Sequence, residues 1–212
     1  MSKPTVTQLE SSSEFVLIEA FKVEEMGAFL AKIMRGDATQ APKRPWFFLG
    51  LMALLGAFVG YFVGSLFSKS LPSDAWVQMG IAFVAFLVVL LPLHELIHGM
   101  VFKALGAKQI GFGWTWKGWM AYCYAQDFVI TMRELIWVAV MPFICLTLGM
   151  LGLLLVLPSY TIAIIFALLL HTTGCMGDFL LIKYARQNKH RQIYTFDDLQ
   201  ERKMTFFYEK TN

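Results

Sequence analysis

Long apolar runs alternate with short polar segments along this chain of 212 residues. Four runs, at 46–67, 75–102, 135–157 and 160–182, reach the ~20 apolar residues that an α-helix needs to cross a bilayer. The pattern therefore predicts an all-α polytopic membrane protein with four transmembrane helices. The composition agrees, because 57% of residues are hydrophobic and only 16% are charged, whereas a soluble domain is nearer one quarter charged.

The polar flanks divide the rest of the chain. Between Ser13 and Gly36, apolar residues recur at helical spacing, which predicts an amphipathic helix, although 15–23 would also suit a strand. The tail contains a candidate short strand at 204–208. We therefore expect a cytoplasmic N-terminal amphipathic segment (1–45), a four-helix transmembrane core (46–183) and a cytoplasmic tail (184–212).

Bulky and small residues alternate in the central loop at 110–124, around Lys117-Gly118. This alternation predicts a short aromatic β-hairpin. It has two interpretations, which are compatible. The hairpin is an aromatic anchor at the membrane interface, or its edge strand holds a peptide extended by β-addition.

Basic residues set the orientation, because cytoplasmic loops carry an excess of Lys and Arg. Of the 18 Lys and Arg residues, 17 lie in the N-terminal flank, the central loop or the tail, and the remaining one is Lys69. Both termini and the central loop are therefore expected in the cytoplasm. The expected location of the protein is the plasma membrane of a prokaryote. The net charge of +3 follows from this topology and does not indicate nucleic-acid binding.

The segment His94-Glu95-Leu96-Ile97-His98 ends the second apolar run. Histidines four apart share a helix face and can bind one metal ion, and Glu95 is then placed to deprotonate a metal-bound water. Two buried histidines hydrogen-bonded between helices are the alternative. Pro92 predicts a kink just ahead of the motif.

A catalytic zinc site needs a third protein ligand. His98 lies five residues before Lys103 and Asp178 lies five before Lys183, so both sit at the same depth. Asp178 is the predicted third ligand, with an ion pair at the membrane interface as its alternative role. His171 lies two turns deeper. It is expected to donate a hydrogen bond to the substrate carbonyl or oxyanion, or else to bond between helices. Cys175 lies nearby and is expected to be a small buried apolar group.

These features together resemble the zincin membrane-peptidase family, which is similar in its core to the site-2 intramembrane zinc metalloproteases. The HExxH segment, the aromatic hairpin, the third span interrupted by Pro142 and Gly177-Asp178 carry the resemblance, which covers roughly 45–185. It implies Zn²⁺ held by His94, His98 and Asp178, with Glu95 as general base. One departure is His171, which stands where the family pattern has an asparagine.

The expected function is therefore zinc-dependent hydrolysis of peptide bonds near the cytoplasmic face of the membrane. The expected partners are the lipid bilayer and a peptide or membrane-protein substrate in extended conformation. A non-proteolytic metal-binding protein that binds a partner is one alternative. A small transporter or proton relay is another, and the absence of an inverted repeat argues against it.

Overall fold

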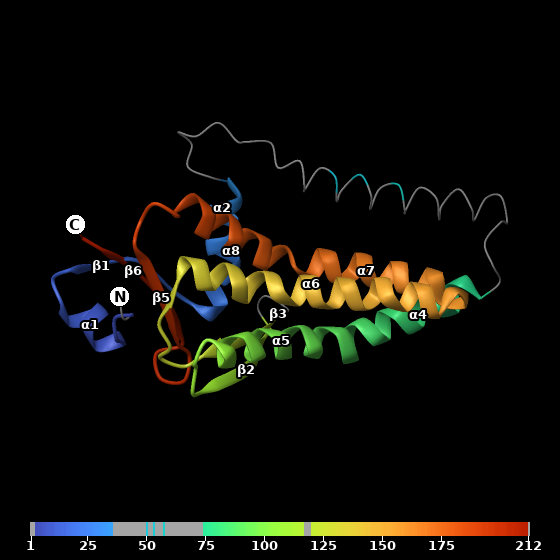
Figure 1. Ribbon diagram of the computed structural model, residues 1–212, viewed down its shortest axis with the longest axis horizontal. Helices are drawn as coiled ribbons and strands as arrows, with labels where there is room; N and C mark the ends of the chain where they lie inside the picture. Colours follow the sequence, from blue (N-terminus) through green and yellow to red (C-terminus); the bar gives the residue numbers. More distant parts are fainter. Residues whose placement is uncertain are drawn as a thin grey trace.

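The computed structural model describes residues 3–35, 50, 53, 57, 74–116 and 120–211. The predicted span at 46–67 lies outside these residues except for three single positions, and the turn at Lys117-Gly118 lies outside them entirely. The long helices run side by side, and a β-sheet lies at one end of them (Figure 1). The HExxH segment, 94–98, lies toward the same end.

Two long apolar helices form the centre of the described chain. The first runs over Ala75–Ala104 and consists of α4 (Ala75–Ala85), a π-helical turn η2 (Phe86–Leu90) and α5 (Leu91–Ala104). The second is α6 (Met132–Val156). Both are long and apolar enough to cross a membrane.

A broken helix pair packs against these two. The 3-10 turn η3 (Pro158–Tyr160) leads into α7 (Thr161–Gly174), and α8 (Met176–Gln187) follows at an angle of 44°. If the pair counts as one span, the described residues contain three candidate spans, and otherwise two. α4 packs on α7, while α6 packs on both α5 and α8. The break between α7 and α8 therefore faces the start of α5.

Four strands in the described part of the chain form an antiparallel sheet in the order β1 (Phe15–Lys22), β6 (Met204–Lys210), β5 (Ile193–Asp198) and β4 (Ile130–Thr131). Its inner face packs through Phe21 and Phe207 on Phe29 of helix α2 (Met26–Arg35) and on Tyr184 of α8. Helix α1 (Val6–Ser11) covers the other face. Strand β4 leads directly into α6, which ties the sheet to the helices.

The all-α prediction is wrong, because 62% of the described residues are helical and 21% lie in strands. The amphipathic helix predicted after Ser13 is present only in its second half, because strand β1 comes first, then the short 3-10 turn η1 (Val23–Glu25), and α2 begins at Met26. The alternative strand at 15–23 and the candidate strand at 204–208 are confirmed. Both faces of β6 are covered, so consecutive residues of this strand are buried. A half-exposed strand would instead alternate buried and exposed residues.

The predicted hairpin is present as β2 (Ile110–Thr115) and β3 (Met120–Ala125), which pair antiparallel. The rings of Tyr124 and Tyr122 lie over Gly111 and Gly113, where no side chain would fit. The opposite face of the hairpin contacts α5. A Cβ on Gly99 would lie 3.1 Å from the Phe112 ring. The hairpin therefore packs closely on the turn that follows His98.

Candidate metal centre

The two histidines of the motif project from the same face of α5. His94 and His98 are each 8% exposed, and their Nε2 atoms lie 3.0 Å apart. The π turn η2 ends two residues before Pro92. A wider turn accommodates the proline ring, which would otherwise clash with a carbonyl one turn back. The helix thus has a π turn ahead of the motif, while the kink predicted there stays a prediction.

Asp178 reaches the same point from another helix. The break at Cys175 starts α8 at Met176, so Asp178 lies in the first turn of that helix. Its Oδ2 is 3.1 Å from Nε2 of His94, and its Oδ1 is 3.6 Å from Nε2 of His98. A carboxylate in the first turn of a helix is also favoured by the helix dipole. The structure thus brings together the three side chains that the sequence singled out as ligands.

A backbone carbonyl on α6 orients His98. Nδ1 of His98 lies 2.9 Å from the carbonyl oxygen of Val138. A carbonyl only accepts, so Nδ1 carries the proton, and Nε2 presents its lone pair toward His94 and Asp178. Pro142 lies four residues after Val138 inside the helix and has no N–H. Pro142 therefore leaves this carbonyl without its usual helical donor and free to accept from His98.

Glu95 lies between the histidines and the hairpin. The backbone N–H of Cys123 on β3 lies beside its carboxylate. Gln126 donates its backbone N–H to Gln109, and with the hairpin register this turns the N–H of Cys123 away from β2, so the outer edge of β3 faces Glu95. The Cys123 thiol stays protonated, because burial raises its pKa to about 12. The hairpin thus places a backbone donor beside Glu95.

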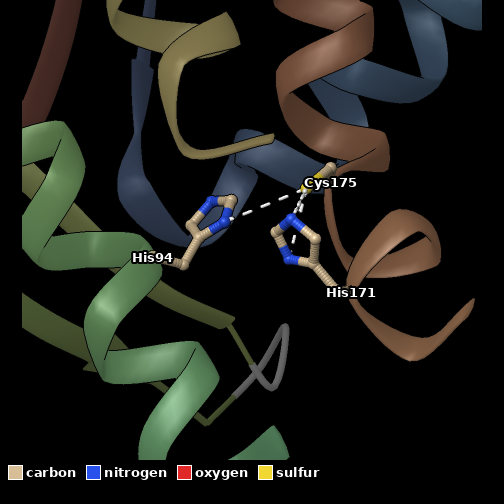
Figure 2. A group of neighbouring side chains, drawn as sticks. All are labelled: His94, His171 and Cys175. Atoms are coloured by element: carbon tan, nitrogen blue, oxygen red, sulfur yellow. Dashed lines mark hydrogen bonds between the residues drawn. The ribbon is translucent and has the colours of Figure 1, made fainter. Parts of the chain in front are cut away.

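His171 lies on the other side of the His94 ring from Asp178. It is 2% exposed, its ring stacks on Phe143 with centroids 6.1 Å apart, and its ring centroid lies 5.6 Å from that of His94. Its nitrogens face the thiol of Cys175 (Figure 2). Asp178 contacts Nε2 of His94, whereas Cys175 lies near its Nδ1. The hydrogen bond from His171 to a substrate stays a prediction.

Cys175 was expected only as a small buried group. The structure buries it completely and places it against two imidazoles. Its spacing of four residues from His171 was visible in the sequence. Its approach to His94 depends on how α5 packs against the break between α7 and α8, which local spacing does not reveal.

The three converging side chains fit a metal ion. Two imidazole nitrogens and a carboxylate lie 3.0 to 3.6 Å apart. Ligands bonded at 2.0–2.1 Å in a tetrahedral site would be about 3.3 Å apart. Lone pairs crowded this closely repel one another unless a cation or a proton lies between them. The chemistry of the donor set and the second-sphere carbonyl on His98 therefore both suit a bound metal.

Comparison with known proteins identifies the family. The model of the family described as "Putative zincin peptidase" matches residues 87–193, half of the chain. The matched region runs from the π turn before the HExxH motif, through the hairpin and α6, to the first residue of β5. No curated protein and no solved structure matches the chain. This protein belongs to the zincin peptidase family that the model describes.

Proposed function

We propose that this protein is a zinc-dependent peptidase embedded in the membrane, which hydrolyses peptide bonds near the cytoplasmic face. The observation that carries the proposal is the convergence of His94, His98 and Asp178 beside Glu95. Membership of a zincin peptidase family supports it independently.

The exposed surfaces of the long helices support the membrane location. Val88 on η2 is 67% exposed, and Leu148 and Leu155 on α6 are 63% and 85% exposed. Large apolar side chains exposed to this degree along both long helices are costly in water and stable in lipid. The excess of Lys and Arg in the flanks and the central loop supports a cytoplasmic location for the sheet and the motif end of the helices.

Each residue of the site has a defined task in the proposed reaction. His94, His98 and Asp178 would hold zinc. When bound, zinc polarises the scissile carbonyl and lowers the pKa of a water molecule toward ~7. Glu95 takes a proton from the attacking water on its free carboxylate oxygen and delivers it to the departing amide nitrogen. The N–H of Cys123, which lies beside the carboxylate, would help to orient Glu95 during both transfers.

The substrate we propose is a peptide or membrane-protein segment in extended conformation. A helical segment hides its carbonyls in its own hydrogen bonds, so a bound segment must be unwound before attack. The outer edge of β3 lies beside Glu95 and offers backbone groups for pairing with an added strand. The hairpin would therefore hold the scissile bond next to the reacting groups.

Glu95→Gln tests the proposal, with Glu201→Gln, an exposed change far from the motif, as the matched control. Each protein is purified in detergent, its zinc is measured, and it is incubated with β-casein and a library of single-span membrane peptides. Glu95→Gln should keep zinc and lose cleavage, detected by mass spectrometry, by at least about 100-fold. Equal cleavage by Glu95→Gln and wild type would contradict the role of Glu95. No cleavage by wild type, together with ion flux in liposomes, would favour a transporter.

A further inference from the structure

A second group of ligand atoms lies behind His94. Sγ of Cys175 is 3.9 Å from Nδ1 of His94 and 3.8 and 3.7 Å from the two ring nitrogens of His171. One ligand atom from each of the three residues can be chosen so that all lie within 4.8 Å of one another. Figure 2 shows the thiol above the His171 ring, with dashed lines to both imidazoles, and Cys175 lies at the break that joins α7 to α8. The proposed reaction uses neither the thiol nor Nδ1 of His94.

We propose that His94, His171 and Cys175 form a second metal site, selective for a soft monovalent cation, with Cu(I) as the ion it would take. Two imidazoles and one thiolate are a donor set typical of copper. Ligands at about 2.05 Å (nitrogen) and 2.3 Å (sulfur) around a trigonal ion would place nitrogen and sulfur about 3.8 Å apart. The observed separations of 3.7 to 3.9 Å match this spacing.

Charge balance favours a monovalent ion. The three side chains are buried among apolar helices, where an uncompensated charge is costly. Binding releases the thiol proton to solvent, so the site contributes one thiolate and two neutral imidazoles. A monovalent cation makes the complex neutral, whereas a divalent cation leaves a buried positive charge. Zinc is therefore disfavoured here, whereas on the other side of His94 the carboxylates of Asp178 and Glu95 together can balance its charge.

The two sites share one imidazole and so exclude each other. A neutral imidazole has a single lone pair, on one of its two nitrogens. When Nδ1 of His94 binds copper, Nε2 carries the proton and can donate it to Asp178, 3.1 Å away. When Nε2 binds zinc, Nδ1 carries the proton instead. Copper would therefore displace zinc and inhibit cleavage, a consequence that rests on the proposed function, whereas copper binding itself does not.

The experiment titrates Cu(I) anaerobically into the full-length protein in detergent, with a chromophoric Cu(I) chelator as competitor. Wild type should bind one ion per chain. Cys175→Ser and His171→Gln should weaken binding at least tenfold, while the matched control Cys145→Ser should not change it. Asp178→Asn should keep Cu(I) and lose zinc, which separates this site from the proposed zinc site. X-ray absorption on wild type should show one sulfur and two nitrogen ligands.

Three results would overturn the inference. The first is an affinity for Cu(I) that Cys175→Ser leaves unchanged. The second is loss of Cu(I) binding in Asp178→Asn, and the third is an X-ray absorption spectrum that shows no sulfur ligand on copper. If Cys175→Ser does not fold, as judged from its thermal melt, the absorption spectrum of wild type decides alone. Zinc release from wild type on adding Cu(I) tests the competition separately. If Cu(I) does not release zinc, the copper site would still be supported and only the predicted inhibition of cleavage would be wrong.

Discussion

Pro142→Ala should weaken zinc binding without destabilising the helix that contains it. Alanine restores an N–H at position 142, one turn after Val138. The carbonyl of Val138 would then accept from this N–H as well as from Nδ1 of His98, which now lies 2.9 Å away. The competing bond loosens the orientation of His98 and of the lone pair on its Nε2.

The two effects have opposite signs. Loss of an outer-sphere partner of a metal-binding histidine typically costs 10–100-fold in metal affinity, or roughly 1.4 to 3 kcal/mol. Proline inside a helix costs ~3 kcal/mol relative to alanine, so α6 itself gains stability. Part of that gain is offset, because the Pro142 ring is fully buried and alanine leaves space behind. We therefore expect zinc affinity to fall at least tenfold while the melting temperature holds or rises.

The assay pairs zinc competition against a chelator with thermal melts followed by circular dichroism, both in detergent. Pro158→Ala is the matched control, because Pro158 begins η3 and lies outside any helix interior. The control should not change zinc affinity. Equal zinc affinity in Pro142→Ala and wild type would refute the orienting role of the Val138 carbonyl. A joint fall in affinity and melting temperature would point to lost packing instead.

Two further predictions concern the hairpin and the sheet. A Cβ on Gly111 would lie 2.2 Å from the Tyr124 ring, so Gly111→Ala should lower stability by about 1 to 3 kcal/mol in thermal melts. Gly149→Ala, whose added methyl group meets open space, should leave stability unchanged. Equal melting temperatures for the two variants would contradict the hairpin packing. Burial raises the pKa of Asp197 to about 6 from 3.8, although Thr205 donates to its carboxylate. The folded state therefore holds the proton better than the unfolded chain, and wild type loses stability as pH rises from about 4 to 6. Asp197→Asn should consequently melt at a higher temperature than wild type at pH 8 and at a similar temperature at pH 4, and no advantage at pH 8 would contradict the burial of this carboxyl.

The local part of the site could be read from the sequence because it depends on helical spacing alone. Histidines four residues apart share a face in any helix, so His94 and His98 meet regardless of the surrounding fold. Counting from the basic residues at the helix ends placed Asp178 at the same depth as His98. The structure brings their side chains together.

Contacts between distant backbone segments could not be read in this way. Pro142 was visible as an interruption of a span, but the side chain that uses the freed Val138 carbonyl depends on how α5 packs on α6. The N–H of Cys123 reaches Glu95 only because the hairpin folds back onto α5. Backbone donors and acceptors have no residue type that would mark them in a sequence.

The sheet was missed because its pairing is non-local. Strand β1 pairs with β6 from the other end of the chain, with Phe15 opposite Lys210. The apolar residues at 15–23 fit both a helix and a strand, and only the distant partner decides between them. Strand β4 has just two residues, Ile130 and Thr131, too few to form a pattern. The hairpin was recognised because its two strands are neighbours in the sequence.

Zinc content tests the central claim most directly. Wild type, His94→Ala and Asp178→Ala are purified in detergent under identical conditions, and zinc per chain is measured by mass spectrometry. The account predicts one zinc per chain in wild type and its loss in both variants, since Asp178 contacts both histidines. Zinc retained by Asp178→Ala but lost from His94→Ala would contradict the ligand set. No zinc in wild type, even after zinc is added, would contradict the metal site itself.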